Sequence, residues 1–98
     1  MDKLPQKPVQ ETLEQKFVVQ NKLGLHARPA ALIVQTANKF QSEITIQKGK
    51  QKINGKSIMG VMMLAAGEGT NVIIRIVGPD ARKAMAAMAK LFQENFQE

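Results

Sequence analysis

The apolar residues of this chain lie on one side of each segment that can form a strand or a helix. In VIIRIV, 72–77, they alternate, so Val72, Ile74 and Ile76 share one face of a predicted strand. The helical segments instead carry a single apolar stripe, with apolar residues three and four positions apart. Elements with one apolar face must bury that face against one another, which predicts a single sheet with helices on one side.

Six further segments follow the same two patterns. Strands are predicted over 16–21, 43–47 and 51–54, and helices over 27–39, over 57–64 and from a cap at Asp80 onward. KGK at 48–50 has the composition of a turn, so the two middle strands form a predicted hairpin. In the first strand, Phe17 and Val19 share one face.

The order of these elements is β-α-β-β-α-β-α. The stripes of the first and last helices are made of Ala30, Ile33, Val34 and Ala37, and of Ala84, Met85, Met88, Leu91 and Phe92. We therefore predict an α+β fold, an open-faced β-sandwich whose four-stranded, mainly antiparallel sheet has three helices on one face. The other face of the sheet can be solvated, as antiparallel sheets allow.

Residues 1–15 contain two prolines and few apolar residues, which predicts a flexible N-terminal extension ahead of a domain over 16–98. No apolar run approaches the ~20 residues of a membrane span, and the N-terminus lacks the apolar region of a secretory signal. Cysteine is absent, which is compatible with the cytoplasm. One histidine and two aspartates argue against a metal site, and no cofactor is expected.

The net charge of +6 suggests acidic partners or nucleic acid. The lysines are spread along the sequence, however, and the chain has four Phe but no Trp or Tyr on which bases could stack. We therefore expect no nucleic-acid partner and keep a basic RNA-binding module only as a distant alternative.

His26, the only histidine, lies in NKLGLHARPAA, 21–31, directly before the first predicted helix. A helix N-terminus has unpaired N–H groups and a positive dipole end, so it can bind an anion such as phosphate. Pro29 lies in the first turn, where its missing N–H costs nothing. Ala27 and Arg28 keep N–H groups that can face the anion, and the Arg28 guanidinium suits phosphate oxygens.

Histidine titrates near physiological pH, so a neutral, nucleophilic ring is available at His26. Beside an anion-binding helix end and Arg28, such a ring favours a phosphohistidine. Gly24, which allows the incoming loop to turn tightly, fits the same interpretation. The alternative is a polar helix cap, and the spacing alone leaves both possibilities open.

GLHARPA, followed by a helix and then by KSIMGVMMLAAGEG, resembles the HPr family, the histidine-containing phosphocarriers of the bacterial phosphoenolpyruvate-dependent phosphotransferase system. The resemblance runs from about Lys16 to the C-terminal end. It implies the open-faced sandwich, a monomer, and a carrier with a phosphohistidine intermediate rather than an enzyme in the strict sense. It also implies that His26 accepts phosphoryl at Nδ1 from Enzyme I and passes it to an EIIA domain for sugar uptake, with Arg28 as the partner of the phosphate.

Ser57 corresponds in this resemblance to the family's regulatory serine, which implies a serine kinase/phosphorylase and a transcriptional regulator as further partners. The position also suits the N-cap of a short helix, and one residue can serve both roles. Val61 and Leu64 are expected in the core. The expected partner-docking surface consists of Ala31, Leu32, Gln35, Lys39, Ile58, Met59 and Met62.

Four other functions compete with the sugar-uptake carrier. A carrier of a regulatory, nitrogen-type branch without a sugar permease stays open, because the sequence separates the two only weakly. A pure docking protein without phosphoryl transfer is disfavoured by the presence of His26. An ATPase is excluded, because five residues rather than four separate Gly49 from Gly55 ahead of GKS. For Ser-His-Asp catalysis, no acid is evidently placed to orient His26.

Overall fold

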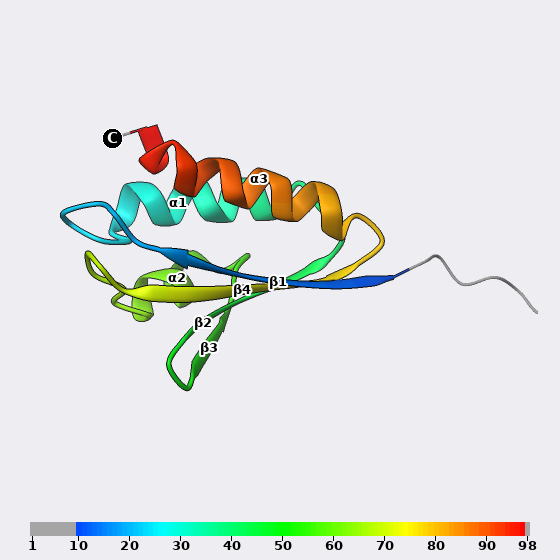
Figure 1. Cartoon of the computed structure of the whole chain (residues 1–98), viewed down its shortest axis with the longest axis horizontal. Coiled ribbons are helices and arrows are strands. Elements are labelled where there is room, and N and C mark those ends of the chain that lie inside the picture. The colour runs from blue at the N-terminus through cyan, green and yellow to red at the C-terminus, as the bar shows by residue number, and fades with distance from the viewer. Residues whose placement is uncertain (1–9, 98) are drawn as a thin grey trace, which may run out of the picture.

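The computed structural model describes residues 10–97 and has the predicted element order (Figure 1). The elements are β1 (Glu11–Val18), α1 (Ala27–Ala37), β2 (Glu43–Lys48), β3 (Gln51–Asn54), α2 (Ile58–Met63), β4 (Asn71–Gly78), α3 (Ala81–Gln93) and a short 3-10 turn, η1 (Asn95–Gln97). The predicted α+β open-faced β-sandwich is confirmed. Within residues 10–97, no helix is both long enough and apolar enough to cross a membrane.

The sheet has the strand order β1-β4-β2-β3, and every neighbouring pair is antiparallel. β4 therefore lies between β1 and β2. Its Ile76 is opposite Leu13 of β1 and Ile44 of β2. α1 and α3 lie side by side over one face of the sheet (Figure 1). β2 and β3 form the predicted hairpin.

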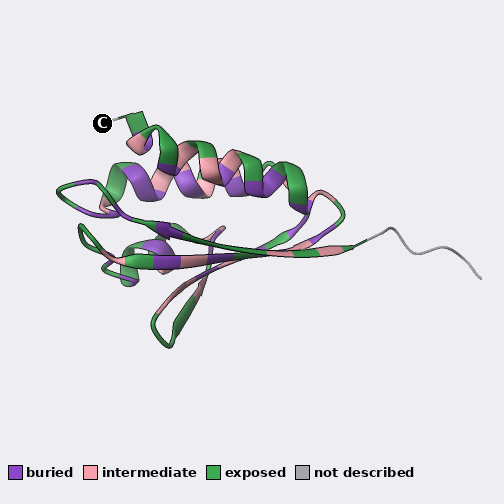
Figure 2. Ribbon diagram, viewed as in Figure 1, coloured by how far each residue is buried: buried purple, intermediate pink, exposed green. Residues whose placement is uncertain are grey.

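The core lies between this face and the helices, where the buried residues, purple in Figure 2, are found. Val72, Ile74 and Ile76 are fully buried, so the alternation along β4 is confirmed. The predicted helix stripes are buried too, although Val34 and Leu91 are only partly covered. Aromatic rings close the core near the C-terminus, in the stacked pair Phe17–Phe92 and the edge-on pair Phe92–Phe96, with ring centroids 4.6 and 4.9 Å apart.

The first strand is longer at its N-terminal end than predicted. β1 begins at Glu11, so residues 11–15 belong to the sheet and not to a flexible extension. These residues are mostly polar and look like a tail in the sequence, but each pairs with β4 and Leu13 packs against the core. The part of the predicted extension over 1–9 lies outside the described residues. α1 is shorter than predicted and ends at Ala37.

Asp80 stands at the N-cap of α3, but the prediction that its side chain caps the helix is wrong. The carboxylate instead accepts hydrogen bonds from the backbone N–H groups of Gln41 and Ser42, each at 2.9 Å, and from the Ser42 hydroxyl. These bonds, with the Ser42 hydroxyl foremost and the Gln41 N–H next, lower the pKa of Asp80 below its ordinary value. Asp80 thus joins the start of α3 to the segment that leads into β2.

This arrangement predicts how stability changes on acidification. Because the pKa of Asp80 is lower in the folded state, the ionised carboxylate adds to the free energy of unfolding above about pH 4, the ordinary range of an aspartate. This contribution is lost as the pH falls through the pKa of the folded state. Asp80→Asn should lower the free energy of unfolding at pH 7 and flatten its fall below pH 4, measured by urea unfolding. Glu68→Gln, an equal charge change at an exposed loop residue, is the control. An acid profile that Asp80→Asn leaves as steep as that of the wild type would contradict this account.

Candidate functional site

His26 is the N-cap residue of α1, with an extended backbone (φ −77°, ψ −166°). Its carbonyl accepts the hydrogen bond from Ala30 N at 2.9 Å, while its side chain makes no capping hydrogen bond to the helix. The half-buried imidazole is therefore not used as a polar cap, and the cap alternative loses its support. The geometry leaves the anion-site interpretation as the better one.

The first turn of α1 presents the positive end of the helix. Ala27 and Arg28 are exposed, Pro29 is buried, and the turn contains no acidic residue that would neutralise the dipole. N–H groups at this position have no acceptor within a helix, so they can face an anion. The predicted placement of Ala27 and Arg28 is what the structure shows, although whether phosphate binds there remains a prediction.

Two hollows flank His26. The larger, of about 660 Å³, is lined by Asn21, Lys22, Leu23, His26, Arg28 and Asn95. Its two cations make it a suitable place for an anionic group. The smaller, of about 230 Å³, is lined by Leu23, Leu25, His26, Met62, Ala65, Ala66 and Gly67. We call it the apolar hollow because its lining side chains other than His26 are apolar. His26 thus lies between the apolar hollow and the hollow that contains Lys22 and Arg28, which we call the basic hollow for these two cations.

The loop that carries His26 is fastened to the segment after α2. Leu25 N donates to Ala66 O at 2.9 Å, and Gly24 N donates to Asn21 O at 3.0 Å. Gly24 has a φ of +68°, and a Cβ at this position would lie 2.4 Å from Ala66 O. The predicted tight turn is confirmed, and glycine is needed there for a second reason, because the two backbones approach closely.

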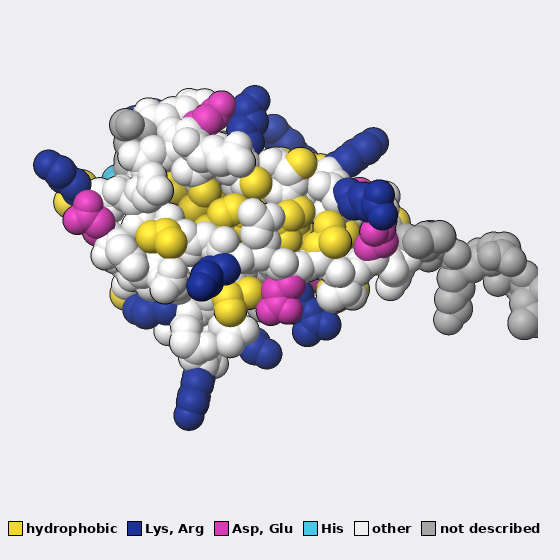
Figure 3. All heavy atoms as spheres, in the orientation of Figure 1, with side chains coloured by type: hydrophobic (Ala, Val, Ile, Leu, Met, Phe, Trp, Pro, Cys, Tyr) yellow, Lys and Arg dark blue, Asp and Glu magenta, His cyan; other side chains and the backbone are white. Residues whose placement is uncertain are grey.

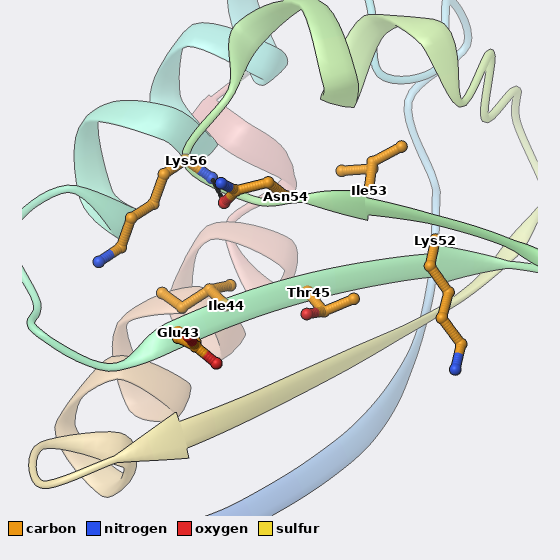
Figure 4. Close-up of a pocket in the computed structure, with 7 residues that line it drawn as sticks. All are labelled: Glu43, Ile44, Thr45, Lys52, Ile53, Asn54 and Lys56. Carbon is orange, nitrogen blue, oxygen red and sulfur yellow. Dashed lines mark hydrogen bonds between the residues drawn. The ribbon is translucent and has the colours of Figure 1, made fainter.

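Ser57 caps α2 as predicted, since its Oγ accepts a hydrogen bond from Gly60 N at 3.0 Å. The turn before it is held by Asn54, whose Oδ1 accepts from Lys56 N at 2.9 Å (Figure 4). Val61 and Leu64 are fully buried, which confirms their predicted place in the core. The short helix therefore has one side in the core and its other side at the surface.

The surface side of α2 carries the apolar residues expected for docking. Ile58, Met59 and Met62 are 42%, 66% and 43% exposed, and Met62 lines the apolar hollow together with His26. On α1 and just after it, Ala31 and Leu32 are half-buried and Gln35 and Lys39 are exposed. Five of the seven are exposed as expected, whereas Ala31 is half-buried and Leu32 packs against the core. The role of all seven in docking remains a prediction.

Sequence reasoning missed several residues of this surface. Leu23 and Met63 are exposed by 77% and 66%, and Leu23 lines both hollows. A leucine inside a polar, glycine-containing loop was a signal that could have identified it. Asn95, which lines the basic hollow from η1, gave no such signal, because only the path of the C-terminal turn brings it there.

Hollows elsewhere on residues 10–97 contain no histidine, because His26 is the only one in the chain. A hollow of about 350 Å³ lies between β2 and β3 and shares no residue with those beside His26 (Figure 4). On the face drawn in Figure 3, Lys and Arg side chains are spread around the outline rather than gathered over one element. Among residues 10–97, no group of three or more His, Cys, Asp or Glu is placed to hold a metal ion.

Comparison with known proteins identifies the family to which this chain is similar. Residues 13–94 match the family described as the PTS HPr component phosphorylation site. The chain is 51% identical over 86 residues to the phosphocarrier protein HPr of Xylella fastidiosa, an alignment that covers 88% of this chain and 97% of the relative. It is 46% identical over 82 residues to the HPr-like protein Crh of Bacillus subtilis, covering 84% and 96%. The crystal structure of HPr from Thermoanaerobacter tengcongensis superposes with a TM-score of 0.85 at 45% identity, covering 88% and 97%.

The close approach at Gly24 predicts a loss of stability on substitution. Gly24→Ala combines a left-handed φ with a methyl group against Ala66 O, so it should lower the free energy of unfolding by at least about 1 kcal/mol. Gly67→Ala is the matched control, because a Cβ there meets nothing within 4 Å; its effect should stay within about 0.5 kcal/mol. The free energies of unfolding of both variants would be measured in urea. Equal effects of the two substitutions would show that the close approach of Gly24 to Ala66 is unimportant for stability.

Proposed function

Because this chain belongs to the HPr family of phosphocarrier proteins, we propose that it accepts a phosphoryl group on His26 from Enzyme I and passes it to EIIA domains for sugar uptake. The observation that carries the proposal is the position of His26, at the N-cap of α1 and beside a hollow that also contains Lys22 and Arg28. The reaction would take place in the cytoplasm, with the carrier as a monomer.

In the uptake step, Nδ1 of the neutral His26 ring attacks the phosphorus. The N–P bond forms as the bond between phosphorus and the donor group on Enzyme I breaks, and that group keeps the electron pair. Delivery to an EIIA domain is the same displacement in reverse, with the acceptor's nucleophile attacking and the His26 ring leaving as a neutral imidazole. The carrier therefore needs only to present the ring and to stabilise charge on the phosphoryl oxygens.

Charge stabilisation comes from the first turn of α1 and from Arg28. The N–H groups of Ala27 and Arg28 lie at the positive end of the helix dipole, where negative charge is favoured. The guanidinium can offer two parallel N–H donors to phosphate oxygens. Because Arg28 is exposed, it can keep contact with the phosphoryl group as one partner leaves and another arrives.

Partner docking uses the apolar surface next to the ring. Ile58, Met59 and Met62 project from α2, and methionines adapt to partners of different shape. Ala31, Leu32, Gln35 and Lys39 of the α1 side extend the predicted surface. A surface of this kind suits a carrier that binds Enzyme I and EIIA domains in turn.

Ser57 is the proposed regulatory site, modified by a serine kinase/phosphorylase and read by a transcriptional regulator. Its hydroxyl lies at the N-terminus of α2, directly before Ile58 and Met59 of the docking surface. A second candidate function is that of a regulatory carrier in a nitrogen-type branch without a sugar permease. The likeness to Crh of Bacillus subtilis, a catabolite repression HPr, supports a regulatory role in general and does not favour that branch.

The central test is the transfer of label from phosphoenolpyruvate through Enzyme I. The wild-type chain should acquire an acid-labile, base-stable label, and His26→Ala should acquire none. Because the imidazole does not cap α1, the variant should fold with a free energy of unfolding within about 1 kcal/mol of the wild type. A folded His26→Ala protein that is labelled at the wild-type rate would refute the proposal.

The regulatory proposal is tested with Ser57→Asp and its neutral counterpart Ser57→Asn. Both residues can cap α2, so both variants should melt close to the wild type. Phosphoserine adds roughly −1.5 to −2 charges and Asp adds one, which places negative charge beside a docking surface built for partners of a basic carrier. We expect Ser57→Asp to accept phosphoryl from Enzyme I roughly tenfold more slowly at subsaturating carrier, and Ser57→Asn to resemble the wild type. Equal rates at low salt would leave Ser57 as a helix cap only.

A further inference from the structure

Lys48, the last residue of β2, has its side chain on the helix-covered face of the sheet. It continues the alternation of the buried residues Ile44 and Ile46 and is itself half-buried. Its ammonium donates hydrogen bonds to Leu64 O at 2.8 Å and to Ala65 O at 3.3 Å. These carbonyls lie at the C-terminal end of α2, where no donor is available within the helix and a cation is favoured.

A second side chain of the hairpin reaches the same end of α2. Gln51, which pairs with Lys48 across the turn, donates from Nε2 to Met63 O at 3.3 Å. Three successive carbonyls, those of residues 63–65, thus receive donors from the two residues that flank the hairpin turn. The hairpin therefore holds the end of α2 at a fixed place relative to the sheet.

The segment held in this way continues directly to the His26 loop. Ala65 has a φ of +49°, a left-handed conformation that residues other than glycine rarely adopt. The next residue, Ala66, offers its carbonyl to Leu25 N at 2.9 Å, and Leu25 directly precedes His26. Ala65 and Ala66 also line the apolar hollow beside the ring.

We propose that Lys48 is a positioning residue for phosphoryl transfer, which fixes the turn over 64–66 and, through Ala66 and Leu25, the direction in which His26 is presented. The inference rests on the proposed role of His26 as acceptor. Transfer between two proteins requires the ring to meet the phosphorus in line, and small displacements of a reacting group are costly. Lys48 acts through the backbone of residues 64–66 and is not proposed to contact the ring or the phosphoryl group.

The structural half of the proposal is tested without any partner, by amide hydrogen exchange. Lys48→Met removes the ammonium and suits the core-facing side, Lys48→Arg keeps a cation with donors, and Lys50→Met is the control at an exposed residue of the same turn. We expect exchange at Leu25 to become about tenfold faster in Lys48→Met, with Ile74 of β4 unchanged. Lys48→Arg and Lys50→Met should resemble the wild type. Unchanged exchange at Leu25, or an equal rise at Ile74, would overturn the proposal.

The functional half is tested by the kinetics of phosphorylation by Enzyme I. We expect kcat for Lys48→Met to fall about tenfold with a smaller change in KM, and Lys48→Arg to restore most of the rate. A rise in KM alone would mean that Lys48 supports docking only, and would overturn its role in presenting His26. If the wild-type chain itself accepts no phosphoryl, the proposed function fails, while hydrogen exchange still decides whether Lys48 holds the His26 loop.

Discussion

The pairing of β1 with β4 is the interaction on which the rest of the structure depends. β4 buries Val72, Ile74 and Ile76 under the helices and hydrogen-bonds to β1 and β2. The pairing continues beyond the strands, because Val19 N donates to Thr70 O at 2.9 Å and Gly69 N donates to Val19 O at 2.7 Å. The loop after β1 and the loop before β4 are therefore aligned before either reaches the functional site.

The site uses this alignment to join two helices of different roles. The first loop leads to His26 and the positive end of α1, and the second comes from α2, whose exposed face carries Met59 and Met62. The hydrogen bond from Leu25 N to Ala66 O brings the two together. One end of a small sheet thus brings together the His26 ring, the positive end of α1 and the exposed apolar residues of α2.

Elements of the fold and of the site that depend on local sequence patterns could be predicted from the sequence. Alternation identifies β4, and the polar hydroxyl of Ser57 before an apolar segment identifies a cap. Contacts between distant segments left no such signal. The polar start of β1 forms a strand only because it pairs with β4. Asp80 accepts a hydrogen bond from Ser42, which lies 38 positions earlier in the chain. Lys48 donates to a carbonyl at the end of α2, 16 positions later. His26 could be proposed as the acceptor from the sequence alone because it is the only histidine of the chain and lies in a motif that resembles that of the HPr family.

Direct observation of the phosphorylated ring by nuclear magnetic resonance tests the central claim most sharply. The chain would be labelled with ¹⁵N-histidine and incubated with Enzyme I and phosphoenolpyruvate. We expect one phosphorylated imidazole, with phosphorus coupled to Nδ1, and the single histidine makes the assignment to His26 unambiguous. An unmodified His26 ring under conditions in which Enzyme I is itself phosphorylated would contradict it.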